Sequence, residues 1–179
     1  MTEPMPDSTV TAGAPQTPDA PVHPLDPARD EEAALILAAC TPEGTAAAGR
    51  GLLAAARFDP DNTVTGLVQD DALLAVCVTH KAPMSVEVTH LVVADGHRRR
   101  GHGRACLQDA LRRAGKRPLV ADTDEAGLPF YRARGFKLVG RRKAPDGSAR
   151  YRLGWHAPAA HPPTRLAGLM TRSRPDDGR

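Results

Sequence analysis

A short basic run with two glycines, at positions 98–104, contains residue types that bind phosphate, in the order Arg-Arg-Arg-Gly-His-Gly-Arg. Guanidinium groups donate paired hydrogen bonds to phosphate oxygens, and glycine lets the backbone approach a ligand closely or adopt a positive φ. The spacing is neither that of a Walker loop, which needs Gly-Lys-Ser/Thr, nor the Gly-x-Gly-x-x-Gly of a dinucleotide site.

The segments on either side of this run predict a strand, a turn and a helix. Residues 87–94 are rich in Val and Thr, which is typical of a buried strand. From Gly103 to Ala114 the apolar residues recur at helical spacing, and Gly115 is a natural stop. Free amides and the dipole at a helix start favour an anion, so the unit predicts a phosphate site. The alternative is an ordinary solvated turn.

Two motifs resemble those of the GNAT superfamily of N-acetyltransferases. Arg98-x-x-Gly101-x-Gly103 is similar to the family's Q/R-x-x-G-x-G/A signature, which binds the pyrophosphate of coenzyme A. Residues 126–136 are similar to the family's A-x-x-x-x-Y-x-x-x-G-F. The resemblance covers about residues 22–155.

The order of predicted elements also resembles the GNAT order. We expect an α/β (α+β) fold with a mixed central sheet, in the order β-α-α-β-β-β-α-β-α-β-β, whose two parallel strands splay apart between flanking helices. The predicted strands span residues 22–25, 64–69, 72–80, 87–94, 118–121, 136–142 and 149–155. The predicted helices span residues 30–40, a segment ending near 57, 103–114, and 123 or 124 to 134.

The resemblance implies that acetyl-CoA is the co-substrate, with its pantetheine arm against backbone groups near Leu91 and Val93 and its pyrophosphate on the amides of the basic run. We expect at most two of the three consecutive arginines to contact phosphate. The residues implied to bind the co-substrate are Leu91, Val92, Val93, Arg98, Arg99, Arg100, Gly101, His102, Gly103, Arg104 and Phe130.

Glu87 is the candidate general base. It lies fourteen residues before Gly101, where the resemblance to the histone acetyltransferase branch places a base glutamate. An amine must be neutral to attack a thioester, and lysine-like amines have a pKa of about 10.4, so a base is useful. The alternative is that Glu87 pairs with an arginine at the solvent end of its strand. His90 is a weaker rival for the base role.

Tyr131 is the candidate general acid, because many family members carry a tyrosine there that protonates the departing thiolate. The alternative role of Tyr131 is packing alone, with its hydroxyl in a hydrogen bond. The family often has asparagine seven residues earlier, where this chain has Asp124. We expect that departure to preserve helix capping and to add negative charge near the co-substrate channel.

The resemblance implies an N-acyltransferase that transfers an acyl group, foremost acetyl, to a primary amine by direct attack in a ternary complex. The competing class is a non-catalytic coenzyme A sensor or adaptor with a basic partner surface. The amine acceptor, small molecule or protein, carries no readable motif, and a homodimer is left open. A net charge of +3 and 3% aromatic residues do not favour nucleic acid.

No apolar run is long enough to predict a membrane span, no signal peptide is recognisable, and no metal-ligand spacing is present. Cys40, Cys77 and Cys106 are expected to be buried reduced thiols of a cytoplasmic protein. The predicted domains are a disordered Pro-rich extension (1–21), the acyltransferase domain (22–155) and a mobile Pro/Arg-rich tail (156–179).

Overall fold

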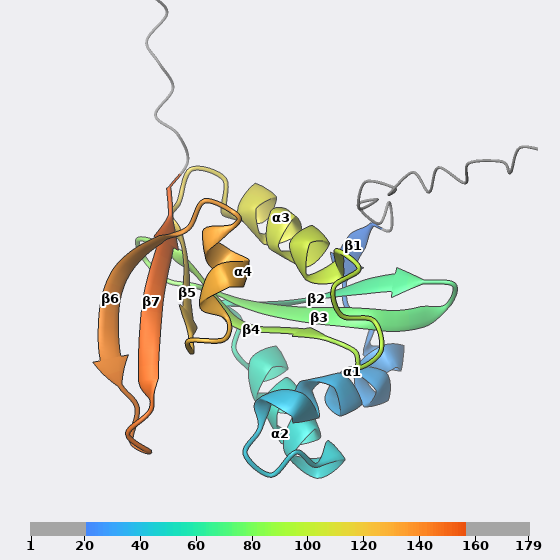
Figure 1. The fold of residues 1–179 in the computed structure, drawn as a ribbon. Coiled ribbons are helices and arrows are strands. Elements are labelled where there is room, and N and C mark those ends of the chain that lie inside the picture. Colours follow the sequence, from blue (N-terminus) through green and yellow to red (C-terminus); the bar gives the residue numbers. More distant parts are fainter. Residues whose placement is uncertain (1–20, 157–179) are drawn as a thin grey trace, which may run out of the picture.

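A seven-stranded mixed sheet forms the centre of residues 21–156, which the computed structural model describes (Figure 1). The strand order is β1-β2-β3-β4-β5-β7-β6, so β1 and β6 are the two edges. The strands are β1 (Val22–Pro24), β2 (Asn62–Gln69), β3 (Ala72–Lys81), β4 (Val86–Val93), β5 (Leu119–Thr123), β6 (Lys137–Lys143) and β7 (Ala149–Trp155). The α-helices are α1 (Asp30–Leu37), α2 (Ala46–Phe58), α3 (His102–Ala114) and α4 (Leu128–Arg132).

The sequence of elements is the predicted one, which confirms the expected fold class. Neighbouring strands are antiparallel except β4 and β5, which are parallel because α3 crosses between them. The predicted N-terminal extension (1–21) and C-terminal tail (156–179) lie, except for residues 21 and 156, outside the described residues. No helix in the described part is long and apolar enough to cross a membrane.

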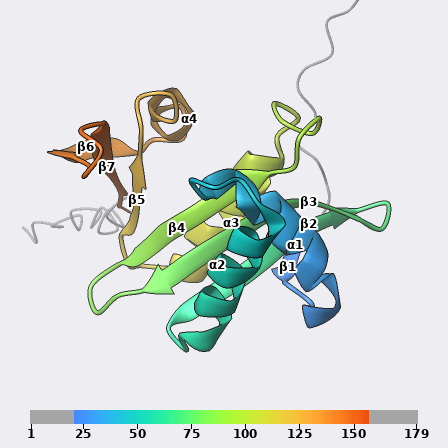
Figure 2. The ribbon, with the colours of Figure 1, turned by 90° about the horizontal axis from the view of Figure 1, so that it is seen from below.

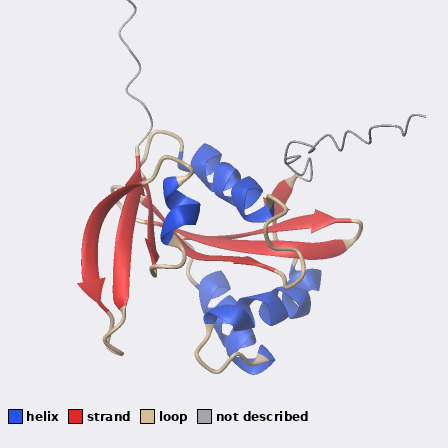
Figure 3. Ribbon diagram, viewed as in Figure 1, coloured by secondary structure: helices blue, strands red, loops and turns tan. Residues whose placement is uncertain are grey.

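Helices cover the two faces of the sheet and enclose two separate cores (Figures 1 and 3). On one face α3 and α4 pack on the sheet through residues such as Leu107 and Tyr131, next to the fully buried Leu119. On the other face α1 and α2 pack on it through Leu37 and Leu53. Each of these helices turns its apolar face toward the sheet, so β4 lies between two apolar layers.

The predicted boundaries of two helices were wrong. The helix predicted to run from residue 30 to Cys40 ends at Leu37, and the chain continues as a tighter 3₁₀ turn, Ala38–Cys40. The helix predicted from Thr123 or Asp124 to Arg134 spans only α4, because β5 extends to Thr123. Asp124 shapes the turn before α4 instead of capping it: its Oδ1 accepts the Gly127 N–H at 2.9 Å.

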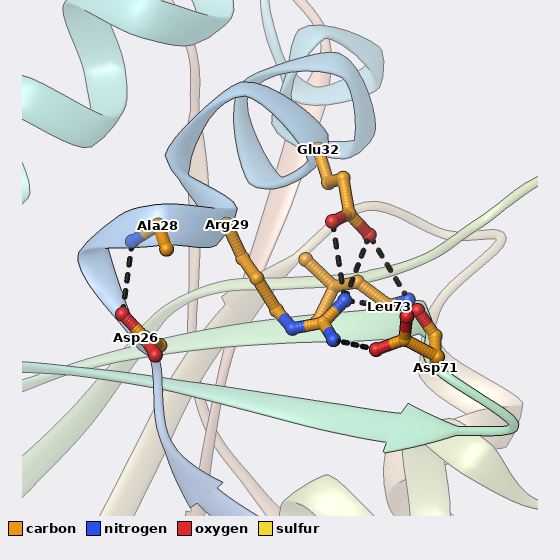
Figure 4. A network of polar contacts seen from close by, with 6 residues as sticks. All are labelled: Asp26, Ala28, Arg29, Glu32, Asp71 and Leu73. Carbon is orange, nitrogen blue, oxygen red and sulfur yellow. Dashed lines mark hydrogen bonds and ion pairs between the residues drawn. The ribbon is translucent and has the colours of Figure 1, made fainter.

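A polar network joins the start of α1 to the β2–β3 turn (Figure 4). Arg29 pairs with the carboxylates of Glu32 and Asp71 and also donates to the Asp71 carbonyl at 3.0 Å. Glu32 in turn accepts the Leu73 N–H at 3.3 Å. Asp70 and Asp71 have φ values of 50° and 60°, as a two-residue hairpin turn requires. This network orients α1 relative to the sheet.

Candidate functional site

A cavity of about 890 Å³ lies where β4 and β5 separate, bounded by the start of α3, by α4 and by the connection between α1 and α2. It contains most residues that the sequence predicted for the co-substrate, together with several that it did not. The lining consists of Ala39, Cys40, Leu91, Val92, Val93, Arg98, Arg99, Arg100, Gly101, Gly103, Arg104, Thr123, Gly127, Phe130, Tyr131 and Arg134.

The cavity exists because the two parallel strands pair over only three residues each. Val86–Val88 of β4 pair with Leu119–Ala121 of β5, and no pairing follows. A bulge contributes to the separation: His90 pairs with Val78 of β3 and Val88 with Thr79, which leaves Thr89 as an extra residue in β4. A bulge bends its strand and increases the local twist. The splayed strands that the resemblance implied are therefore present.

Beyond the bulge, β4 presents an unpaired backbone edge to the cavity. Leu91, Val92 and Val93 line it there, as expected for the wall beside a pantetheine arm. Their other edge is occupied by β3, since Leu91 pairs with Cys77 and Val93 with Ala75. An extended ligand can hydrogen-bond to such an edge as an added strand would.

The turn before α3 has the backbone geometry of an anion site. Gly101 has φ of 92° at the position just before the helix, and Arg99 has φ of 61°. The first hydrogen bond from the turn to the helix joins the Ala105 N–H to the Gly101 carbonyl at 3.0 Å. The preceding amides at the helix start lack intrahelical acceptors and are available to an anion.

Gly103 keeps the floor of this site open. A Cβ there would lie 3.4 Å from the Phe130 ring and 3.5 Å from the Val93 side chain, so a larger side chain would enter the cavity.

Arg98 lines the cavity but is exposed and pairs with Asp95 at 3.0 Å. His102 is only 4% exposed and is the one residue predicted to bind the co-substrate that does not line the cavity.

Arg134 lines the cavity although the sequence prediction missed it. Its guanidinium stacks 4.1 Å above the Phe130 ring and donates to the Phe130 carbonyl at 2.6 Å, while its buried Nε has no protein partner. Burial and the nearby charge of Arg104 lower the Arg134 pKa. An anion between Arg104 and Arg134 would offset this repulsion. In the helix that the sequence predicted to reach Arg134, this residue would lie one turn after Tyr131, and that spacing was a usable signal.

Tyr131 lies in the same cavity, on α4, and is 8% exposed. Its ring packs edge-on against Phe130 and Phe136, with centroid distances of 5.1 and 5.3 Å. Burial raises the Tyr131 pKa, and the positive charge of Arg150 acts in the opposite direction. The hydroxyl is therefore in its protonated, donor form at neutral pH.

Glu87 lies outside the cavity lining. Its Oε1 accepts from Arg152 Nη1 at 2.7 Å, and the same Nη1 lies 2.9 Å from Asp122 Oδ2. The arginine partner named as the alternative to a base role is thus present. His90 is half-buried, and burial lowers its pKa, which favours the neutral imidazole.

The three thiols differ in burial. Cys77 and Cys106 are buried as predicted, but the prediction for Cys40 was wrong. Cys40 is exposed because α1 ends before it, and it lines the cavity from the 3₁₀ turn. In the described part of the chain no group of three or more His, Cys, Asp or Glu is arranged to hold a metal ion.

Comparison with known proteins identifies the family. A family model described as an acetyltransferase (GNAT) domain matches residues 36–152. The chain belongs to the GNAT acetyltransferase family. No curated protein matches it significantly.

Solved structures of N-acetyltransferases share the fold. An aminoglycoside 6'-N-acetyltransferase complexed with coenzyme A has a TM-score of 0.67 at 14% identity, over 75% of this chain and 96% of that one. The Enterococcus faecium aminoglycoside 6'-N-acetyltransferase has a TM-score of 0.63 at 15% identity, with coverages of 75% and 96%. The ribosomal-protein-S18-alanine N-acetyltransferase from Escherichia coli has 0.61 at 19% identity, with coverages of 75% and 92%. The acceptors in these names differ, so the shared fold leaves the acceptor of this GNAT domain open.

Proposed function

We propose that the chain is an N-acyltransferase that transfers an acyl group, foremost acetyl, from a coenzyme A thioester to a primary amine. The observation that carries this proposal is a single cavity that joins the Arg98–Arg104 turn, the open edge of β4 and Tyr131. A site that only sensed coenzyme A would need the turn and the edge but no proton donor between the separated strands.

Acetyl-CoA, the acyl donor, would be bound at two places. The amides at the start of α3, with Arg104 and Arg134, would bind the pyrophosphate, and the backbone at Leu91 and Val93 would bind the pantetheine arm. These residues fit acetyl-CoA, because the cavity lining combines arginines, one of which has a buried Nε without a protein partner, with apolar residues. When bound, acetyl-CoA supplies an activated acyl group that passes directly to the acceptor amine.

Glu87 is proposed to take the proton that the amine loses. Arg152, which Asp122 also contacts, binds its carboxylate beside the last paired residues of β4 and β5, next to the point where the strands separate. The carboxylate does not line the cavity, so we propose that a water molecule relays the proton. The neutral imidazole of His90, on the same strand, is the alternative group to accept this proton.

Tyr131 is proposed to donate its hydroxyl proton to the departing sulfur. Burial keeps the phenol protonated, and the flanking Phe130 and Phe136 rings fix its direction. Cys40 is exposed, but its position in the cavity wall partly removes it from water, and this desolvation raises the pKa of its thiol. Because such a thiol is a poor nucleophile at neutral pH, a direct transfer is favoured over an acyl-enzyme.

The test is thiol release from acetyl-CoA across a panel of amines, with mass spectrometry of the acylated acceptor. Amine-dependent thiol release with a matching acetylated product supports the proposal. Tight acetyl-CoA binding without thiol release for any amine, peptides and amino acids included, would favour the sensor function. A cytoplasmic location remains a prediction.

A further inference from the structure

Five charged side chains cluster on the sheet face beside the separation of β4 and β5. Arg152 bridges Glu87 and Asp122, and Arg142 reaches Asp122 at 3.7 Å. Arg150 donates to the Asp122 carbonyl at 3.4 Å. We call these five residues the charged-face cluster. In Figure 2, α1 and α2 lie over β2, β3 and β4 and not over β5, β7 and β6, the three strands that carry the other four residues besides Glu87.

Two of its arginines are direct cross-strand neighbours. Arg142 of β6 pairs in register with Arg150 of β7. Like charges directly opposite each other destabilise a sheet, because their Cβ atoms are only about 5 Å apart. The arrangement therefore has a cost in stability that an anion between the two guanidinium groups would remove.

The carboxylates of the cluster do not balance this charge. Glu87 and one oxygen of Asp122 are engaged by Arg152, at 2.7 and 2.9 Å. Arg142 shares that same Asp122 oxygen at the longer distance of 3.7 Å, and its side chain is 61% exposed. Three guanidinium groups thus share two carboxylates, which leaves the cluster one net positive charge beside Arg142 and Arg150. The further carboxylate on which Arg150 acts is that of Asp146, which is fully exposed in the turn between β6 and β7.

This surplus charge lies close to the proposed reaction centre. Arg142 and Arg150 both contact Asp122, and the next residue, Thr123, lines the cavity that contains Tyr131. Arg152, two residues along β7, contacts the proposed base Glu87. An acceptor whose amine reaches the acyl group between Tyr131 and Glu87 would therefore have Arg142 and Arg150 beside the rest of its structure.

We propose that the acceptor is an amine that also bears a carboxylate, as in a free amino acid, and that Arg142 and Arg150 bind this carboxylate. The inference rests on the proposed acyl transfer and specifies its acceptor class. Paired guanidinium groups suit the two oxygens of a carboxylate, whereas a polycationic acceptor would be repelled by the same surplus charge.

Binding of a reaction product tests this inference without turnover. N-acetylglycine, N-acetylalanine, N-acetylphenylalanine and N-acetylglutamate would be titrated by calorimetry in the presence of coenzyme A, each against the corresponding N-acetylated amine without a carboxylate. We expect at least one acid to bind about tenfold or more tightly than its neutral partner, as for a charge-assisted pair. Equal affinities for all pairs would overturn the proposal.

Matched arginine variants locate the effect. Arg142→Gln and Arg150→Gln should each weaken binding of the preferred acid about tenfold or more and abolish its advantage over the neutral partner. Arg141→Gln is the control, because Arg141 lies beside Arg142 on β6 but stacks on the Tyr151 ring, with its guanidinium carbon 5.5 Å from the ring centroid. Equal losses in all three variants would contradict a carboxylate site at Arg142 and Arg150.

Turnover separates the two proposals. Thiol release is compared between amino acids and amines without a carboxylate, such as an aminoglycoside. If an amine without a carboxylate reacts as fast as every amino acid or faster, the acceptor class is wrong and acyl transfer still stands. A preference for N-acetyl amino acids without thiol release for any amine would overturn acyl transfer and leave the carboxylate site standing.

Discussion

Arg152 Nη1 lies 2.7 Å from Glu87 Oε1, and this ion pair joins β7 to β4 across the intervening β5. Glu87 lies one residue before Val88, which forms the last pair between β4 and β5 with Ala121. Both side chains are partly exposed, 41% for Arg152 and 27% for Glu87, so the pair contributes little to stability, about 0–1 kcal/mol. Its main consequence is that Glu87 has a fixed position beside the cavity.

Glu87→Gln should therefore affect catalysis more than folding. We expect thiol release to fall most at low pH, where most of the amine is protonated and a base matters most. The loss should shrink as pH rises and more amine is already neutral. The measurement is the pH profile of kcat/KM for both proteins, with thermal unfolding as the control. A loss independent of pH would contradict a base role, and an unchanged profile would leave His90 as the candidate.

Gly103→Asp should abolish acetyl-CoA binding. The new carboxylate would enter the cavity beside Phe130 and Val93 and would repel a phosphate. Isothermal calorimetry should show no measurable heat of binding with the variant. Gly51→Asp is the matched control, because Gly51 lies in α2 and a Cβ added there would have nothing within 4 Å. Wild-type affinity in Gly103→Asp would contradict the phosphate site.

The strand–turn–helix unit around Gly101 could be predicted from the sequence because its signals are local. Val and Thr enrichment marked β4, helical spacing marked α3, and Gly101 does adopt the positive φ that favours glycine. The parallel pairing of β4 and β5 followed from the intervening helix.

The contacts of Glu87 could not be predicted in the same way. They depend on the register of three strands, which brings together residues 65 and 30 positions apart in the chain. The first residue of α4 could not be predicted either, because it depends on where β5 ends, and β5 is fixed by its pairing with other strands. A Cβ on Gly127 would lie 2.0 Å from Thr123 Oγ1, so the turn between β5 and α4 is closely packed. No periodic pattern in the sequence encodes that packing.

Two glycines of α2 should respond oppositely to the same change. Gly49→Ala should destabilise the protein by about 1–3 kcal/mol, since its Cβ would lie 2.0 Å from the Ala34 carbonyl oxygen of α1. Gly51→Ala, with open space around it, should stabilise the protein by about 0.5–1 kcal/mol through helix propensity. Thermal denaturation of both variants measures the two shifts. Similar shifts in the two variants would contradict the close approach of α1 and α2 at Gly49.

Stability should fall as pH rises above about 8.5, the ordinary pKa of a thiol. Burial raises the pKa of Cys106 to about 12 and raises that of Cys77 as well. In this pH range the unfolded thiols lose protons that the folded ones retain, so each buried thiol contributes stability below its unfolded pKa and loses it as pH rises. At pH 9.5 the loss is about 1.4 kcal/mol per thiol.

Urea unfolding between about pH 7.5 and about pH 10, the range where thiols titrate, measures this slope. Cys106→Ala should be less stable at the lower pH but should lose less stability as pH rises. Cys40→Ala should keep more of the wild-type slope, because Cys40 is exposed in the fold. A Cys106→Ala slope equal to the wild-type slope would contradict the burial-based explanation.

The most direct measurement of the central claim is thiol release from acetyl-CoA by wild-type protein and Tyr131→Phe, with an accepted amine at saturating concentration. The variant keeps the ring packed between Phe130 and Phe136 but lacks the hydroxyl proton. We expect kcat to fall about a hundredfold or more while acetyl-CoA affinity changes little, since acid–base assistance is worth about 10²–10⁴-fold. Wild-type kcat in Tyr131→Phe would contradict the acid role. Tight acetyl-CoA binding by the wild-type protein, with no thiol release for any amine, would contradict acyl transfer itself.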